Sequence, residues 1–195
     1  MCIRDRLWVG DRTRYINSEH LDFVSKLDNP IGIKIGPKIK IDDIPAICSK
    51  VNPQNEQGKL IFIVRLGEKN IEKMLPKIIE KVKYYGHEII WFCDPMHGNT
   101  IKSQNGYKTR QFKTIINELE AFFNIHMSSN TIPGGVHIEL TGENVTECLG
   151  GINDIKDIDL DLRYETACDP RLNNEQSLEI AFLISKLIKQ RKNNG

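Results

Sequence analysis

Three segments of the chain each place a residue that can bind a metal ion or transfer a proton after an apolar run. The sequence DPMHGNT follows the apolar run IIWFC and supplies His97. The sequence GGVHIELTGE supplies Glu139, and YETACDP supplies Asp169. Short apolar runs of this kind are typical of buried strands, and a histidine at the mouth of a strand is poised to bind metal or to move protons. We therefore expect one histidine and two carboxylates at strand ends to form a divalent-metal site.

Nitrogen and carboxylate ligands of this kind suit manganese, cobalt, iron or zinc. A single strand-end histidine is more often structural, whereas three such residues at the strand ends of one parallel sheet point to a shared ion. His137 is separated from Glu139 only by Ile138, so both side chains face the same side of a strand. His137 is therefore either a group that supports the ligands or an alternative ligand.

Cationic side chains also lie near the ends of predicted strands. Lys34 stands between two isoleucines, and burying its ammonium group is costly unless an anion meets it. Arg65 ends the most apolar strand, and Arg12 follows the first one; the arginine fork suits phosphate and carboxylate. Lys34 could instead reach solvent from an edge strand, and Arg65 could pair with a helix carboxylate. Together, Arg12, Lys34 and Arg65 predict an electropositive pocket for a phosphorylated or carboxylated substrate.

The order of apolar and amphipathic segments predicts the elements that hold these residues. Strands are expected at residues 7–9, 31–35, 60–65, 89–92, 136–140 and, as a weaker pattern, 164–168. Helices are expected at residues 17–24, 42–52, 70–85, 112–124 and 177–189. The last helix has the apolar set Leu178, Ala181, Phe182, Ile184, Leu187 and Ile188. Alternating strands and helices imply a parallel sheet with helices outside it, and no Gly-x-Gly-x-x-Gly motif supports a dinucleotide fold.

The candidate residues all lie at the carboxyl ends of successive predicted strands. A (β/α)8 TIM barrel places its active site at that end of its strands, so the predicted fold class is α/β with a barrel architecture. About six strands amount to an incomplete barrel. Because a complete barrel takes ~250 residues, we expect this chain to hold about the last six strands and to lack the first two.

Composition and charge narrow the classes of protein and partner. The 195 residues, with 39% apolar and 27% charged side chains, fit one globular domain. A net charge of +1 gives no reason to expect nucleic acid or an acidic membrane as a partner, and no apolar run approaches the ~18 residues of a membrane span. The five scattered cysteines form no Cys-x-x-Cys pair and favour a reducing cytosol. Residues 1–6 are atypical, so we expect residues 7–195 to form the domain.

The segments that carry this chemistry closely resemble the class II (plant-type) 3-deoxy-D-arabino-heptulosonate 7-phosphate (DAHP) synthases. The resemblance runs from Trp8 to near Lys186. The sequences that carry it are WVGDRTR, NPIGIKIGP, CDPMHGNT, NGYKTR, PGGVHIELTGENVTECLGG and RYETACDPRLN. So many long matches in the same order are highly specific.

The resemblance implies a (β/α)8 barrel that joins phosphoenolpyruvate to erythrose 4-phosphate and releases inorganic phosphate. This reaction is the first step of the shikimate pathway, which leads to chorismate and the aromatic amino acids. In the family a divalent metal, typically manganese or cobalt, is held by Cys, His, Glu and Asp. The last three ligands match His97, Glu139 and Asp169.

The family's phosphoenolpyruvate contacts map onto Asp11, Arg12, Lys34 and Arg65, although position 11 is more often Glu in the family. The implied mechanism uses the metal as a Lewis acid on the aldehyde oxygen of erythrose 4-phosphate. The enol of phosphoenolpyruvate attacks the aldehyde carbon while the cationic side chains hold its phosphate and carboxylate. Water then adds and phosphate leaves. Lys34 and His97 are the residues that the resemblance makes catalytic.

The chain departs from the family pattern at the metal site. The family's cysteine ligand lies on its first barrel strand, upstream of Trp8, and no residue of this chain maps to it. A further phosphoenolpyruvate arginine and most of the erythrose 4-phosphate site also lie upstream. We therefore expect this chain alone to be inactive or nearly so. The full-length protein is expected to be a homo-oligomer in the bacterial cytosol or, for a plant-type homologue, in a plastid.

Three other interpretations stay open. A different metal-dependent barrel enzyme, such as a hydrolase or another aldolase, would make the matched motifs accidental. A non-catalytic phosphate-binding or regulatory subunit derived from the same barrel would keep Lys34 and Arg65 without turnover. The chain could also be an incomplete reading of a gene, which the atypical residues 1–6 favour. Metal affinity discriminates the enzyme from the subunit, because a complete site holds manganese tightly and three ligands without the cysteine hold it weakly.

Overall fold

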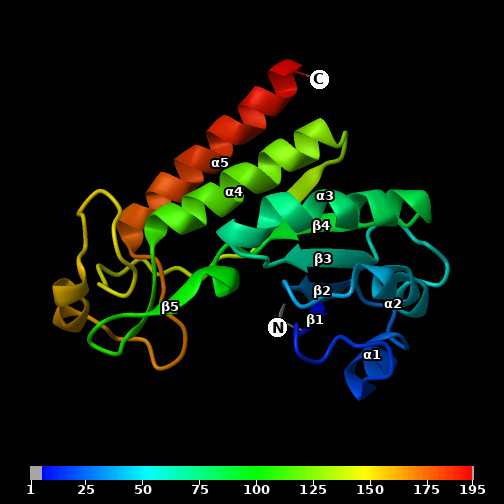
Figure 1. Cartoon of the computed structure of the whole chain (residues 1–195), viewed down its shortest axis with the longest axis horizontal. Helices are drawn as coiled ribbons and strands as arrows, with labels where there is room; N and C mark the ends of the chain where they lie inside the picture. Colours follow the sequence, from blue (N-terminus) through cyan, green and yellow to red (C-terminus); the bar gives the residue numbers. More distant parts are fainter. Residues whose placement is uncertain (1–5, 195) are drawn as a thin grey trace.

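Two fully buried strands lie side by side in the middle of a parallel sheet (Figure 1). In the computed structural model, which describes residues 6–194, β2 (Ile31–Ile35) and β3 (Leu60–Val64) are buried at every position. β1 (Leu7–Val9) lies beside β2, and β4 (Ile90–Cys93) lies beside β3. β7 (Pro133–Val136) lies beside β4. The strand order β1-β2-β3-β4-β7 is therefore the chain order, which is compatible with part of a barrel. Residues 1–5 of the atypical segment 1–6 lie outside the described residues.

Helices connect the strands of the sheet, as the alternating sequence pattern predicted. They are α1 (Glu19–Val24), α2 (Ile44–Val51), α3 (Glu68–Tyr84), α4 (Phe112–Ser128) and α5 (Asn174–Asn194). Short 3-10 helices span Ile41–Asp43, His97–Asn99 and Asp157–Leu162. Among the residues that the structure describes, no helix has both the length and the apolar character needed to cross a membrane.

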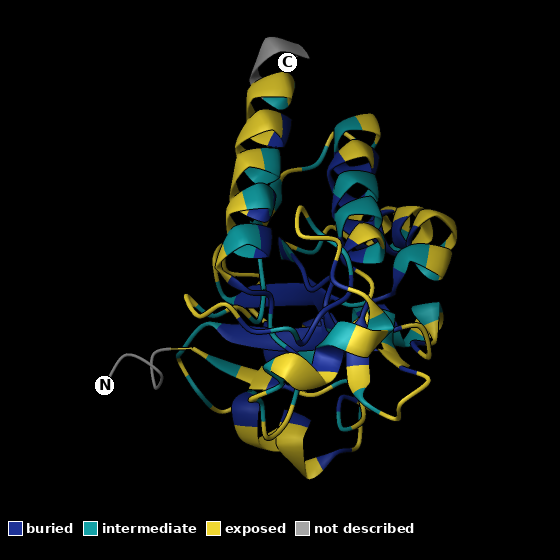
Figure 2. Ribbon diagram, turned by 90° about the vertical axis from the view of Figure 1, so that its left-hand side faces the viewer, coloured by how far each residue is buried: buried dark blue, intermediate teal, exposed yellow. Residues whose placement is uncertain are grey.

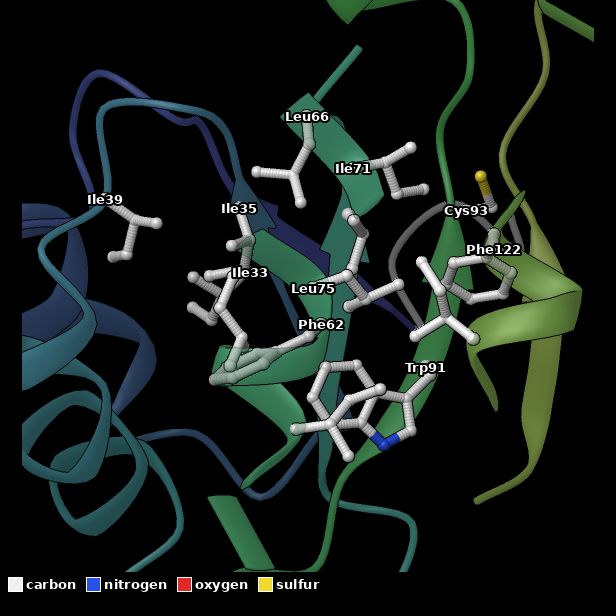
Figure 3. Packing of buried hydrophobic residues seen from close by; sticks show 14 of the residues in the cluster. Ile33, Ile35, Ile39, Phe62, Leu66, Ile71, Leu75, Trp91, Cys93 and Phe122 are labelled. Atoms are coloured by element: carbon white, nitrogen blue, oxygen red, sulfur yellow. The ribbon is translucent and has the colours of Figure 1, made fainter. Parts of the chain in front are cut away.

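One face of the sheet carries the main hydrophobic core (Figure 3). Ile33 of β2, Phe62 of β3 and Trp91 of β4 pack with Leu75 of α3 and with residues of α2 and α4. The Phe62 and Trp91 rings meet edge to face at 5.7 Å. Because side chains alternate along a strand, Lys34 points to the opposite side from Ile33, away from this core.

The hydrogen-bond ladder of the sheet continues one residue past the strands. The backbone amides of Arg65, Asp94 and His137 each donate to the last carbonyl of the neighbouring strand, at 2.7–2.8 Å. The residues that directly follow β3, β4 and β7 therefore keep the spacing of the sheet. This shared carboxyl edge brings residues that are distant in sequence to one level.

The predicted position of the strand near residue 136 was wrong by three residues. The strand is Pro133–Val136 rather than residues 136–140. Gly134 and Gly135 allow this placement, because a Cβ atom would lie 2.7 Å from Ile90 at the first position and 2.9 Å from Phe92 at the second. The two glycines therefore let β7 approach β4 closely.

The predicted strand at residues 164–168 does not form. The backbone amides of Glu165 and Thr166 donate to the carboxylate of Glu147 instead of to a neighbouring strand. Asp169 consequently lies in an irregular loop rather than at a strand end. Within residues 6–194 the main sheet has five strands, where about six were predicted.

An antiparallel hairpin in the loop after His97 was not predicted. β5 (Thr100–Lys102) and β6 (Lys108–Arg110) pair with each other, and Gly106 lies between them with a φ of +87°.

Two predicted helix ends are confirmed. Ser18 Oγ accepts a hydrogen bond from Leu21 N as an N-cap of α1, and Gly86 follows the end of α3 with a φ of +68°.

The apolar set predicted for the last helix is only partly buried. Leu187 and the unpredicted Ile180 are buried, whereas Leu178, Phe182 and Ile188 are exposed. The reason is visible in Figures 1 and 2, where α5 lies beside α4 and extends away from the sheet, so that only one narrow face of the helix is covered. The helical period was predicted correctly, but the face of α5 that is buried was not.

The exposed face of α5 leads to a prediction about stability. Phe182 is 73% exposed and Ile180 is 2% exposed. We expect Phe182→Ser to change the free energy of unfolding by no more than about 0.5 kcal/mol, and Ile180→Val to lower it by about 0.5–1.5 kcal/mol. Urea unfolding of both variants provides the measurement. A larger loss for Phe182→Ser than for Ile180→Val would mean that this face of α5 is covered in solution.

Candidate functional site

A pocket of about 740 Å³ opens at the carboxyl edge of the sheet. Its lining brings together six of the seven site residues predicted from the sequence: Asp11, Arg12, Lys34, Arg65, His97 and Asp169. The seventh, Glu139, contacts His97 from outside the pocket lining. Residues of β1 and β2, residues that follow β1, β3 and β4, and residues from later parts of the chain thus converge on one space.

Asp94 joins the two predicted catalytic side chains. Lys34 Nζ donates to Asp94 Oδ2 at 2.5 Å, and His97 Nδ1 lies 2.8 Å from the same oxygen. Asp94 is fully buried, and its Oδ1 accepts hydrogen bonds from the backbone amides of Met96 and His97. The carboxylate therefore orients His97 and supplies the anion that a buried lysine requires.

The environment shifts the pKa of each member of this group. Burial would raise the pKa of Asp94, but the hydrogen bond from His97 and the charge of Lys34 hold it well below its usual range. Hydrogen bonds to Asp94 and Glu139 raise the pKa of His97 to about 9. Burial lowers the pKa of Lys34 despite the opposing charge of Asp94. In the metal-free protein His97 is thus a cation held between carboxylates.

His97, Glu139 and Asp169 form the cluster that the sequence predicted as metal ligands. One potential ligand atom from each of the three lies within 4.8 Å of the others. His97 Nε2 is 3.2 Å from Glu139 Oε1 and 3.9 Å from Asp169 Oδ2. Nitrogen and carboxylate oxygens at this spacing fit a divalent cation such as manganese or cobalt. Binding through Nε2 requires the His97 proton to leave.

Two cations from the β5–β6 hairpin neutralise these carboxylates. Arg110 is fully buried, and its Nη1 donates to Glu139 Oε2 at 3.0 Å while Nη2 lies 3.6 Å from Asp169 Oδ1. Lys108 forms an ion pair with Asp169 Oδ1. Burial would raise the pKa of Glu139 and of Asp169, but these cations and His97 hold both below their ordinary values. Both carboxylates are therefore ionised and available as ligands.

The predicted substrate-binding residues Arg65, Asp11 and Arg12 line the same pocket. Arg65 Nη1 donates to Asp11 Oδ2 at 3.2 Å, and its Nη2 donates to the His97 carbonyl at 3.0 Å. The other oxygen of Asp11 accepts from Arg14 Nε at 2.9 Å and from the Gly36 amide at 2.8 Å. The Asp11 carboxylate thus binds both Arg65 and Arg14. Arg12 is exposed on the pocket lining.

Sequence reasoning missed two residues of the site and left a third unassigned. Asp94 stood directly after a predicted strand, but it received no role beside His97. Arg110 ends the NGYKTR segment, where nothing in the sequence marks it as fully buried. The His137 ring lies 6.2 Å from that of His97, yet its nitrogens fall outside the ligand cluster. Burial and the nearby Lys34 lower the pKa of His137.

Glu118 of α4 supports the loops that follow β3 and β4. It is fully buried; its Oε1 accepts from the Gly67 amide at 2.7 Å, and its Oε2 accepts from Asn99 Nδ2 at 2.6 Å. Asn99 Oδ1 in turn accepts from the Glu68 amide at 3.0 Å. Glu118 therefore ties the start of α3 to the segment that carries His97. Burial, which outweighs these hydrogen bonds, raises the pKa of Glu118 to about 8.

The raised pKa of Glu118 predicts a pH dependence of stability. Its carboxyl titrates near 4.5 in the unfolded chain and near 8 in the folded protein. Its contribution to stability is complete below the lower value and is lost as the pH rises through the upper one, by about 1.4 kcal/mol per unit of pKa difference. We expect Glu118→Gln to flatten this loss in urea unfolding between these pH values. Glu120→Gln on the same helix should keep the wild-type slope, and equal slopes for all three proteins would contradict the prediction.

Comparisons with known proteins identify the same family that the sequence motifs resemble. The model of the class-II DAHP synthetase family matches residues 2–185. The chain is 51% identical over 183 residues to the phospho-2-dehydro-3-deoxyheptonate aldolase AroG of Mycolicibacterium smegmatis, covering 94% of this chain and 39% of the relative. It is 47% identical over 181 residues to the phospho-2-dehydro-3-deoxyheptonate aldolase of Streptomyces coelicolor, covering 93% and 40%.

The matches cover nearly all of this chain but only part of each relative. The chain spans about two-fifths of the length of the curated relatives it matches. The matched part nevertheless includes every residue of the pocket and of the carboxylate cluster. Since the family model covers nearly the whole chain and about half of the aligned residues are identical to those of two relatives, this chain belongs to the class-II DAHP synthetase family.

Proposed function

We propose that this chain carries the metal-binding and phosphoenolpyruvate-binding part of a 3-deoxy-7-phosphoheptulonate synthase. The reaction joins phosphoenolpyruvate, erythrose 4-phosphate and water to give DAHP and inorganic phosphate. The observation that carries the proposal is the single pocket that Lys34 and Arg65 share with His97 and Asp169. Family membership supports it, because the names of both relatives describe an enzyme of a phosphorylated deoxyheptonate.

His97, Glu139 and Asp169 would hold the divalent metal, with manganese or cobalt as the proposed ion. Their donor atoms and mutual spacing fit such an ion. When bound, the metal supplies Lewis acidity toward the carbonyl oxygen of erythrose 4-phosphate. By family resemblance the remaining ligand is a cysteine from a part of the protein outside this chain.

Lys34 and Arg65 would bind the phosphate and carboxylate of phosphoenolpyruvate. Arg65 is held by Asp11 and by the His97 carbonyl, so its guanidinium is oriented before the substrate arrives. Arg12 adds a further cation at the exposed rim. Asp11 would contribute by orienting Arg65 and Arg14, because both of its carboxylate oxygens already accept hydrogen bonds.

Lys34 is the proposed catalytic group beside His97. Its Nζ carries a proton that the buried Asp94 carboxylate holds in place. Because burial lowers the pKa of Lys34, transfer of this proton to a leaving phosphate is easier than from an exposed lysine. Asp94 would keep His97 oriented through Nδ1 while Nε2 faces the ligand cluster.

The whole enzyme is proposed to be a (β/α)8 barrel in which residues 7–195 form the C-terminal part. Five parallel strands in sequential order are compatible with such a barrel. Both relatives are bacterial proteins, so the proposed location is the bacterial cytosol, and neither relative supports the plastid alternative. The full-length protein is proposed to be a homo-oligomer, and this chain alone to be inactive or nearly so.

Calorimetric titration of the purified chain with phosphoenolpyruvate tests the proposed function. We expect binding that weakens about tenfold to a hundredfold in Arg65→Met, which removes charged hydrogen bonds to the ligand. Arg163→Met serves as the control, because Arg163 pairs with Glu143 and Glu165 and does not line the pocket. Equal affinity of Arg65→Met and wild type would overturn the assignment of the pocket. Synthase turnover by the chain alone would overturn the expected inactivity.

A further inference from the structure

The loop that carries Asp169 is held in place without regular secondary structure. Residues 163–171 form no helix or strand, yet Asp169 Oδ2 lies 3.9 Å from His97 Nε2 across the cluster. A carboxylate on a loop without support loses conformational entropy when it binds an ion. Something other than regular secondary structure must therefore hold this loop.

Glu147 is the group that the loop surrounds. It is fully buried. Its Oε1 accepts from the amides of Glu165 at 3.2 Å and Thr166 at 2.9 Å and from Arg171 Nη2 at 2.6 Å. Its Oε2 accepts from the Arg171 amide at 2.7 Å and from Arg171 Nε at 3.0 Å. One side chain thus satisfies three backbone amides and two donors of a guanidinium fork.

These donors lie on both sides of Asp169 in the sequence. Glu165 and Thr166 precede it, and Arg171 follows it, so Glu147 closes the loop from its two ends. Thr166 Oγ1 also donates to the Asp169 carbonyl at 2.8 Å. The ligand is therefore connected to Glu147 through one short bridge of hydrogen bonds.

Glu147 itself belongs to a firmly anchored segment. Thr109 Oγ1 donates to the Glu147 carbonyl at 2.8 Å, and the Leu149 amide donates to the Arg110 carbonyl at 2.8 Å. Gln176 Nε2 of α5 donates to the Cys148 carbonyl at 3.1 Å. The segment is thus tied to β6 and to α5. Glu147 does not line the pocket, and among the described residues its carboxylate forms its hydrogen bonds with the Asp169 loop rather than with His97 or Glu139.

We propose that Glu147 is a positioning residue that fixes the Asp169 carboxylate for a divalent cation. The inference rests on the metal site of the proposed function. Groups that orient metal ligands typically change metal affinity by about tenfold to a hundredfold when they are replaced. Glu147 differs from such groups in acting through the backbone of the ligand's loop rather than on the ligand atom.

Glu147→Gln is the most informative variant. Its amide oxygen can still accept from the Glu165 and Thr166 amides at the position of Oε1. Its NH2 group then stands in place of Oε2, where it faces the Arg171 amide and Nε and cannot accept from them. Mn²⁺ binding is measured from the electron paramagnetic resonance signal of the free ion, and inorganic phosphate binding is measured by calorimetry on the same protein. We expect Mn²⁺ affinity to fall about tenfold to a hundredfold while phosphate affinity stays at the wild-type value.

Two further variants keep the test decisive. Glu143→Gln is the matched control, because Glu143 is an exposed carboxylate outside the Asp169 loop that pairs with Arg163, and we expect wild-type Mn²⁺ affinity from it. Arg171→Met removes two of the donors to Glu147 from a partly exposed position. It serves if Glu147→Gln does not fold, and we expect it to weaken Mn²⁺ in the same direction.

The outcomes separate this inference from the proposed function. Unchanged Mn²⁺ affinity in both Glu147→Gln and Arg171→Met would overturn the inference. An equal loss of Mn²⁺ and phosphate binding would also overturn it, because Glu147 would then only stabilise the fold. A wild-type chain that binds no Mn²⁺ removes the metal site and the inference with it. A full-length protein that binds Mn²⁺ through these ligands but makes no DAHP overturns the proposed function alone.

Discussion

Replacing Asp94 with alanine is expected to lower the free energy of unfolding by about 3–5 kcal/mol, as is typical when one partner of a buried ion pair is removed. Asp94 is fully buried and pairs with Lys34, which is 6% exposed. Its removal leaves an ammonium group in the interior without an anion and frees the amides of Met96 and His97. Urea unfolding followed by tryptophan fluorescence gives the measurement.

A second lysine–aspartate pair provides the control for this experiment. Lys81 and Asp42 lie 2.7 Å apart, but Asp42 is on the surface. We expect Asp42→Ala to leave the free energy of unfolding close to the wild-type value, because solvent screens such pairs. The double variant Lys34→Met/Asp94→Leu should recover part of the loss, since it removes both charges. A loss in Asp94→Ala no larger than in Asp42→Ala would contradict the buried pair.

Replacing Gly98 with alanine is expected to lower the free energy of unfolding by about 3 kcal/mol, at the upper end for overpacking. A Cβ atom at this position would lie 2.5 Å from the Gly67 nitrogen and 3.0 Å from the Arg65 carbonyl oxygen. Both obstacles are backbone atoms, so the loops after β3 and β4 must move apart. Because Arg65 donates to the His97 carbonyl, the same movement should weaken phosphate binding in the pocket.

Gly142→Ala is the matched control for the Gly98 variant. A Cβ atom at Gly142 would have no neighbour within 4 Å, so stability should stay within about 0.5 kcal/mol of wild type. Thermal unfolding and phosphate calorimetry on both variants test the prediction. Wild-type stability and wild-type phosphate affinity in Gly98→Ala would mean that the two loops are not in close contact.

The sequence was sufficient to predict the central strands and the edge at which the site lies. The apolar run of β3 and the isoleucines around Lys34 in β2 were enough to identify buried strands, and helical periodicity identified α3 and α4. Once these elements alternate, parallel strands must end at one edge of the sheet. Lys34, Arg65 and His97 could therefore be grouped from the sequence alone, and all three line the pocket.

The support for Asp169 could not be predicted in the same way. The segment around it was interpreted as a strand from a weak residue pattern, whereas its backbone amides bond to a side chain distant in sequence. Periodicity describes how a segment repeats and carries no information about such a partner. The available signal was Glu147 itself, a carboxylate directly before the apolar pair Cys148 and Leu149, which is costly to bury unless donors surround it.

The buried face of α5 and the role of Arg110 could not be predicted from the sequence for a related reason. The apolar residues of α5 extend around more of the helix than α4 covers, so tertiary contacts select Ile180 and Leu187 and leave Phe182 in solvent. Arg110 lies in a short polar hairpin whose sequence matches an exposed loop. Only the fold shows that this hairpin brings a guanidinium onto two carboxylates.

The separation of the two edges of the sheet has a practical consequence for handling this protein. The pocket lies at the carboxyl ends of the strands and in the loops that follow them, whereas the loop before β3 contains the exposed Gly58, which has open space around it. An affinity tag or a surface linker inserted next to Gly58 would attach the protein by the edge remote from the pocket. Immobilised in this orientation, the chain presents the pocket and the His97–Glu139–Asp169 cluster to flowing solution, as biosensor tests of the proposed phosphate and Mn²⁺ binding require.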